Sequence, residues 1–306
     1  MNKRMITVGA RGSLLSVAQT EGVIRSLKRR FPRYVFTLKR ITTLGDTSKT
    51  WSRQDQGIFV KEIEEQLLNG QIDLAVHSVK DLPSQIPPGL NLAGITKRVD
   101  PRDLLVSRDG AALGDLKPGA LVGTSSLRRK AFLMIHRPDL RVSDLRGNLD
   151  TRLRKLNEGQ YDAIIVAAAG IKRLGIKGFK GKKISADIML PACGQGALGI
   201  EVRSTDRQMV RLARAINCPR TYACVCCERE FLRRVGGGCR LPIASFARMI
   251  KGNICLSVLI ASLDGKISVS LKKTVPVKKY LVLARELAEQ ALDKGARRIL
   301  EDINNG

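Results

Sequence analysis

The sequence is poor in aromatic residues and in histidine. Phe, Trp and Tyr make up 4% of its 306 residues, and only two histidines are present. Few aromatic rings are therefore available to stack on the bases of a single-stranded nucleic acid. No helix-turn-helix, zinc-finger or RNA-binding signature occurs either. We therefore expect that the protein requires no nucleic acid. The length of the chain predicts about two or three domains.

Long apolar runs and a leader pattern are also missing. No segment of about 18 consecutive apolar residues occurs, which predicts that the chain does not span a membrane. The first residues, MNKRMITVGARGS, pass into a strand-like segment without the pattern of a secretory signal peptide. We therefore expect a cytoplasmic protein without a membrane partner.

Acidic residues are too few to balance the basic ones. The chain has 54 Lys and Arg against 28 Asp and Glu, which gives a formal net charge of +26. Such a surplus attracts polyanions. Two alternatives for the charge stay open, namely nucleic-acid binding through bulk charge and a role in solubility alone.

The seven cysteines predict neither a disulfide framework nor a zinc site. Their number is odd and their spacing is irregular. The cluster CVCC at 224–227 is not matched by a second CxxC, and His77 and His136 are remote from it in the sequence. Cys239 differs from the others because it follows three glycines and precedes Arg240 in RVGGGCRLP. The glycines permit a bend and the arginine favours a thiolate, so Cys239 is a candidate nucleophile or attachment point.

Strand-like and helix-like segments alternate over the first 200 residues. Segment 59–70 has apolar residues at helical spacing and ends in Asn-Gly, and the apolar segment 72–79 follows it as a buried strand. This alternation predicts mostly parallel sheets covered by helices. The last third instead has strand-like segments separated by short turns, followed by an amphipathic helix over 279–295. We expect two α/β domains and a smaller α+β domain with Cys239 near its start.

Two predicted strand-to-helix turns carry the same kinds of hydrogen-bond donor. The N-terminus of a helix attracts anions through its free N–H groups, and arginine matches the geometry of a carboxylate. Alternatively, the serines only cap the helices and the arginines are solvated. The residues at the first turn are Arg11 and Ser13, and those at the second are Thr124, Ser125, Ser126, Arg128 and Arg129. Three further arginines follow the second turn, namely Arg146, Arg152 and Arg173.

The stretch AVHSVKDLP places polar residues directly after an apolar strand. His77, Ser78, Lys80 and Asp81 precede Pro83, which cannot continue the strand. The carboxyl ends of strands in open α/β sheets are where ligand sites gather. Asp81 is therefore a candidate catalytic carboxylate and Lys80 a candidate anion ligand, although an ordinary Lys-Asp turn would give the same pattern.

Together these motifs resemble the porphobilinogen deaminase family, whose members are hydroxymethylbilane synthases. The resemblance covers nearly the whole chain, in the order in which the family has its motifs. The motifs are ARGSLLSVAQT, GIFVKEIEEQLL, DLAVHSVKDLP, GTSSLRR, DLRGNLDTRL, AAAGIKRLG, LPACGQGALGIE and GGGCRLPIAS.

The resemblance implies a fold of two periplasmic-binding-protein-like α/β domains around a cleft, plus a smaller α+β C-terminal domain. The first domain would be discontinuous, comprising residues 1–96 and 197–216. The second would comprise residues 97–196, and the third residues 217–306. A monomer is expected.

The resemblance also implies a reaction and a cofactor. The family joins four porphobilinogen molecules head to tail into a linear tetrapyrrole and releases ammonia each time. A dipyrromethane primer, linked by a thioether to the residue matching Cys239, starts the chain. Neither a metal nor a nicotinamide is required. A non-catalytic solute-binding module with two α/β domains is the alternative, but it would need no primer thiol.

Site residues follow from matching motifs. Asp81 would be the catalytic carboxylate that stabilises positive charge near the pyrrole N–H and relays protons. The cofactor would be held by Cys239, Lys80, Asp81, Thr124, Ser125, Ser126, Arg128, Arg129 and Arg146. The incoming substrate would be held by Arg11, Ser13, Arg152, Arg173 and Gln195.

The sequence departs from the family's pattern at a few positions. Gln56 replaces a lysine that is common in the family, and the neighbouring Arg53 is a candidate to compensate for the lost anion contact. Leu44 stands where a basic residue is common, and Gly236 where glutamate is frequent.

Overall fold

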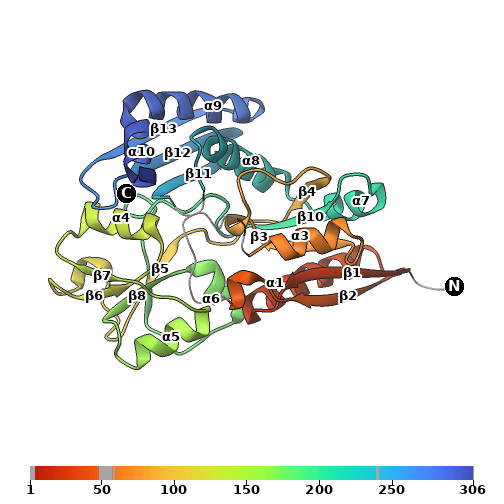
Figure 1. Cartoon of the computed structure of the whole chain (residues 1–306), viewed down its shortest axis with the longest axis horizontal. Coiled ribbons are helices and arrows are strands. Elements are labelled where there is room, and N and C mark those ends of the chain that lie inside the picture. Colours follow the sequence, from red (N-terminus) through yellow and green to blue (C-terminus); the bar gives the residue numbers. More distant parts are fainter. Residues whose placement is uncertain (1–3, 48–56, 58, 239–240, 306) are drawn as a thin grey trace. The chain divides into compact units, whose positions relative to one another are not determined.

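The computed structural model describes residues 4–47, 57, 59–238 and 241–305. The chain divides into two compact units (Figure 1). Unit 1 consists of residues 1–99 and 197–223, and unit 2 consists of residues 100–196 and 224–306. The division into three domains stays a prediction.

Unit 1 is built on a five-stranded sheet with the order β2-β1-β3-β10-β4. Strand β1 is parallel to β2 and β3, whereas β10 is antiparallel to both of its neighbours. The strands are β1 (Arg4–Arg11), β2 (Tyr34–Ile41), β3 (Leu74–Ser78), β4 (Leu90–Ile95) and β10 (Leu198–Arg203). The helices are α1 (Leu14–Arg30), α2 (Leu44–Thr47), α3 (Lys61–Leu68) and α7 (Arg207–Ala215).

Helices cover both faces of this sheet. Apolar residues of α1 and α7 share one core with the sheet, while Ile63 and Leu67 of α3 belong to a second core with Ile41, Ile72 and Ala75. Because both faces are covered, strands β1 and β3 are largely apolar along their length. The polar residues that follow them therefore come at the strand ends, where no core has to be filled.

Unit 2 contains a second five-stranded sheet with the order β7-β6-β8-β5-β9. Its helices α4 and α5 contribute to separate cores, through Phe132 and Leu156 respectively. The strands are β5 (Asp103–Ser107), β6 (Leu121–Gly123), β7 (Arg141–Ser143), β8 (Ala163–Ala167) and β9 (Gly181–Lys183). The helices are α4 (Leu127–His136), α5 (Leu149–Asn157) and α6 (Ala168–Leu174).

The C-terminal part of unit 2 is an antiparallel sheet with helices on it. The order is β11-β12-β13, and the core between sheet and helices contains Phe231, Leu256 and Leu287. The opposite face contributes Ala244 and Ala261 to the core that holds Phe132 of α4. The strands are β11 (Ile243–Ile250), β12 (Asn253–Ala261) and β13 (Ser268–Pro276). The helices are α8 (Pro219–Arg234), α9 (Tyr280–Ala291) and α10 (Arg297–Asn305).

The predicted α/β class with a smaller α+β part is confirmed. Both large sheets are mixed, however, rather than mostly parallel. Strand β10 is antiparallel to its neighbours in unit 1, and β5 is antiparallel to β8 and β9 in unit 2. In unit 1 the reason is that residues 197–223 return to the sheet and insert β10 between β3 and β4. No helix in the described part of the chain is long and apolar enough to cross a membrane.

Replacing Gly94 with alanine is expected to destabilise unit 1. A Cβ at this position of β4 would lie 2.4 Å from the carbonyl oxygen of Ala213, at the end of α7, so the helix would have to move. Overpacking of this kind costs about 1–3 kcal/mol. Urea unfolding of Gly94→Ala should show this loss, whereas Gly114→Ala, where a Cβ meets nothing within 4 Å, should not. Equal stability of the two variants would contradict the close packing of α7 on β4.

Candidate functional site

A small pocket of about 50 Å³ lies in unit 1 where β1 and β3 end and α1 begins. It brings together three of the predicted site residues, Arg11, Ser13 and Asp81. The other lining residues are Leu15, Ser16, Gln19, Phe59, Val60, Val76, His77 and Ser78. The pocket therefore combines one cationic group, one acidic group and several hydroxyl and amide groups.

Local structure fixes the pocket's polar side chains. Ser13 is the N-cap of α1, and its Oγ accepts a hydrogen bond from the Ser16 amide at 3.3 Å. The Arg11 guanidinium lies over the Phe59 ring, 4.1 Å from its centroid, which is a cation–π contact. The first predicted strand-to-helix turn therefore has both the cap and the arginine that the sequence indicated.

Asp81 ends a short 3-10 helix, Val79–Asp81, that directly follows β3. Its side chain lines the pocket and is half-buried. The adjacent Ser78 donates a hydrogen bond from Oγ to Gln19 Oε1 at 3.1 Å, which joins β3 to α1 beside Asp81. Lys80 is half-buried and does not line this pocket.

Three ionisable groups beside the pocket are buried, and one of them, His77, also lines it. His77 Nε2 lies 3.0 Å from Glu201 Oε2, and the two side chains are 3% and 0% exposed. Glu64 of α3 lies near both of them. Burial, together with the charge of Glu201, raises the pKa of Glu64 to about 7, against an opposing effect of His77. Neither Glu64 nor Glu201 was predicted from the sequence to be a functional residue.

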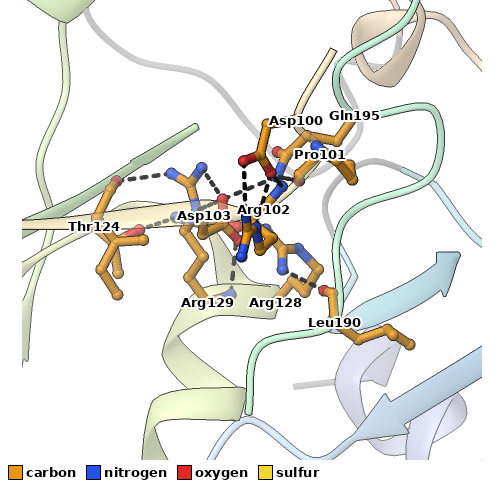
Figure 2. A network of polar contacts seen from close by, with 11 residues as sticks. Asp100, Pro101, Arg102, Asp103, Thr124, Arg128, Arg129, Leu190 and Gln195 are labelled. Carbon is orange, nitrogen blue, oxygen red and sulfur yellow. Dashed lines mark hydrogen bonds and ion pairs between the residues drawn. The ribbon is translucent and has the colours of Figure 1, made fainter. Parts of the chain in front are cut away.

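In unit 2, Arg128 and Arg129 converge on one buried carboxylate, that of Asp103 (Figure 2). Arg128 Nη2 donates to Asp103 Oδ2 at 2.6 Å, and Arg129 Nη2 donates to Oδ1 at 2.7 Å. Arg129 Nε also donates to Oδ1, at 3.2 Å. The Nη1 atoms of Arg128 and Arg129 donate to the main-chain oxygens of Leu190 and Ile165, at 2.6 Å and 2.8 Å respectively.

Gln195 completes this group, which we call the Asp103 cluster: Asp103, Arg128, Arg129 and Gln195. Gln195 Nε2 donates to Asp103 Oδ1 at 3.0 Å and to the carbonyl oxygen of Pro101 at 2.6 Å. Figure 2 shows Gln195 approaching Asp103 from the chain segment that precedes β10.

The Asp103 cluster carries an excess of positive charge. Burial by itself would raise the pKa of Asp103, but Arg128 and Arg129 outweigh it and hold the pKa of this carboxyl below its usual range. Burial lowers the pKa of Arg128, and Asp103 opposes that effect. Because guanidinium groups stay protonated in proteins, two cations face one anion at this place. A buried excess of positive charge is stabilised when a further anion binds beside it.

The N-terminus of α4 provides the donors that the sequence predicted next to these arginines. Ser126 caps the helix and accepts from the Arg129 amide at 3.4 Å. Thr124 is buried, and its Oγ1 accepts from the Ser126 amide at 3.2 Å. Ser125, between them, is exposed.

The three remaining arginines lie on neighbouring elements of unit 2. Arg146 is exposed in the loop before α5 and lies 3.8 Å from the Asp144 carboxylate. Arg152 of α5 donates from Nε to the Gly147 carbonyl at 2.8 Å. Arg173 of α6 donates to the Gly196 carbonyl at 2.8 Å, and burial lowers its pKa to about 10.

Cys239, Arg240, Arg53 and Gln56 lie outside the described residues. Among the residues that the structure does describe, no group of His, Cys, Asp and Glu side chains could hold a metal ion. Fold and site together indicate an α/β protein with binding groups for acidic ligands.

The comparisons name the family. The model "Porphobilinogen deaminase, dipyromethane cofactor binding domain" matches residues 6–211, and "Porphobilinogen deaminase, C-terminal domain" matches residues 222–293. The porphobilinogen deaminase of Desulforudis audaxviator is 43% identical over 99% of both chains. That of Deinococcus radiodurans is 44% identical over 98% of this chain and 99% of the relative.

The chain therefore belongs to the porphobilinogen deaminase family, and the predicted resemblance is confirmed. It is an enzyme, a transferase of tetrapyrrole biosynthesis, and its cofactor is the family's dipyrromethane.

Solved structures give only weak likenesses. The benzoate-bound BenM effector-binding domain has a TM-score of 0.43 at 14% identity and covers 72% of this chain and 97% of its own. The probable amino-acid ABC transporter binding protein ytmK of Bacillus subtilis has a TM-score of 0.41 at 14% identity, over 70% and 90% of the two chains. The family assignment does not depend on either of them.

The substitution Asp103→Asn is expected to destabilise unit 2 strongly. It leaves two buried guanidinium groups without a counter-charge, a loss that costs about 3–5 kcal/mol. Asp139→Asn removes the partner of Arg137 in a more exposed ion pair, where solvent screens the interaction, and should cost much less. Urea unfolding of both variants measures the difference, and a small effect of Asp103→Asn would contradict the role given to the cluster.

Proposed function

We propose that the enzyme joins four porphobilinogen molecules into the linear tetrapyrrole hydroxymethylbilane and releases one ammonia at each addition. Growth starts from a dipyrromethane that is linked by a thioether to Cys239. The observation that supports this most directly is the pocket in which the Asp81 carboxylate meets Arg11 and Ser13.

Asp81 is proposed as the catalytic carboxylate. When the aminomethyl group of a pyrrole leaves as ammonia, positive charge develops near the pyrrole N–H. A fixed carboxylate stabilises that charge and accepts or returns a proton. Asp81 suits this role because it is held at the end of β3 and lines the pocket.

Arg11 and Ser13 are proposed to bind the acidic side chains of the incoming pyrrole. Porphobilinogen carries an acetate and a propionate group, and guanidinium and hydroxyl donors match these carboxylates. The contact with Phe59 holds Arg11 at the pocket wall before any substrate arrives. We assign Arg152, Arg173 and Gln195 to substrate binding as well.

The residues of unit 2 fit the dipyrromethane, which bears carboxylates of its own. The Asp103 cluster has a positive excess, and the start of α4 supplies hydroxyl groups beside it. When bound, the group supplies the free pyrrole carbon to which the first substrate is joined. The residues proposed to hold it are Cys239, Lys80, Asp81, Thr124, Ser125, Ser126, Arg128, Arg129 and Arg146. The monomeric state and the cytoplasmic location stay predictions.

Intact-mass measurement of the purified enzyme tests the thioether. The mass should exceed that of the sequence by two pyrrole units, because the primer stays covalently bound. Cys239→Ser should have the mass of its sequence and no activity, while Cys255→Ser, at a buried core position, should keep the added mass. An unmodified and inactive enzyme after incubation with excess porphobilinogen would contradict the assignment.

Asp81→Glu tests the catalytic carboxylate. The longer side chain displaces the carboxylate, so kcat should fall by roughly 100-fold or more while the primer stays bound. Stopped assays of hydroxymethylbilane, together with intact mass, separate these two effects. Glu21→Asp, at an exposed position of α1, is the matched control and should turn over normally. Normal turnover of Asp81→Glu would rule out the proposed role.

A further inference from the structure

Three ionisable side chains from three elements of unit 1 lie near one another beside the Asp81 pocket. His77 comes from β3, Glu201 from β10 and Glu64 from α3. His77 also lines the pocket itself, so it connects the buried group to the site. Neither Glu201 nor Glu64 has a part in the function proposed above.

The contact between His77 and Glu201 has the geometry of a fixed hydrogen bond. The Nε2 to Oε2 distance is 3.0 Å, and both side chains are almost completely buried. Strand β10 is antiparallel to β3, with Gly199 opposite His77 and Glu201 opposite Ala75. Since both residues lie on central strands, the imidazole has little freedom to turn. A carboxylate that accepts from one ring nitrogen sets which nitrogen carries the proton.

The two carboxyl groups are not fully paired. Glu201 Oε1 and Glu64 Oε1 are both buried and have no hydrogen-bond partner among the described residues. Unpaired carboxylate oxygens in an apolar environment are costly, and that cost falls when a proton is shared. A purely structural role would be served better by apolar side chains of similar size. The free-energy cost of burying these unpaired carboxyl groups therefore indicates that they have a function.

We propose that His77, Glu201 and Glu64 form a buried ionisable triad that tunes the electrostatic potential of the Asp81 pocket. Glu201 orients His77, and Glu64 gains or loses the proton that changes the charge of the triad. This inference rests on the proposed function, and it makes His77 and Glu201 positioning residues.

The direction of the effect follows from the charges around the triad. Of the residues that the structure describes, Arg11 and Asp81 are the charged groups that line the pocket beside His77. The pKa of Glu64 is about 7, so the side chain is neutral below that pH and negative above it. Added negative charge stabilises the positive charge that develops in the reaction, and it opposes binding of the acidic substrate. Both kcat and KM should therefore rise as the pH passes through about 7, each roughly three- to tenfold.

A spectroscopic experiment tests the triad without any assay of activity. The chain has only two histidines, so the His77 ring signals in the NMR spectrum can be assigned with His136→Gln. The His77 signals should shift near pH 7 as Glu64 ionises. The shift should be lost in Glu64→Gln and kept in Glu65→Gln, which changes an exposed residue of the same helix. Absence of a shift between pH 6 and pH 8 in the parent enzyme would overturn the proposal, whether or not the variants fold.

Kinetics provide the second readout. The pH dependence of kcat and KM near pH 7 should flatten in Glu64→Gln and persist in Glu65→Gln. Glu201→Gln, which keeps a hydrogen-bonding oxygen but loses the charge, should also alter the pH profile. Identical profiles for parent, Glu64→Gln and Glu201→Gln would overturn the proposal. Failure of the parent enzyme to consume porphobilinogen would instead refute the proposed function and leave the NMR result to decide on the triad.

Discussion

Two guanidinium groups share one buried carboxylate in unit 2, so positive charge exceeds negative charge at this place. The hydrogen bonds around the two arginines follow from that excess. Arg128 and Arg129 are held by Asp103 and by main-chain oxygens, so their positions are fixed before any ligand is present. One carboxylate cannot neutralise both. The excess positive charge favours a ligand with acid groups of its own, and the family's dipyrromethane is such a ligand.

A buried group in unit 1 has the opposite imbalance. Glu201 contacts the imidazole of His77, and Glu64 lies near both of them, next to the pocket with Asp81. A negative environment suits a step in which positive charge develops, just as a positive one suits the retention of carboxylates. The proposed chemistry thus uses one buried cluster with surplus cations, around Asp103, and one buried group with surplus carboxyl groups, around His77.

The sequence predicted the local part of this arrangement well. Ser13 and Ser126 cap helices, which is the alternative role that the sequence left open, and Asp81 follows an apolar strand. Caps and strand ends depend on neighbouring residues, so a sequence can indicate them. Asp103 and Glu201 were missed as partners of Arg128 and His77. They are 25 and 124 positions away, and only the completed sheets bring them together. The sequence also did not predict that β10 is antiparallel to its neighbours, because strand direction in a sheet depends on chain topology.

The late arrival of β10 has a consequence for synthesis of the chain. Within the described part of the chain, strand β4 pairs with β10 alone, and β10 also completes the pairing of β3. A ribosome must therefore deliver all of residues 100–196 before the first sheet can close. Until then the nascent N-terminal segment has an open edge, to which another strand could add. The sheet of this unit can thus be completed only after residue 203 has left the ribosome.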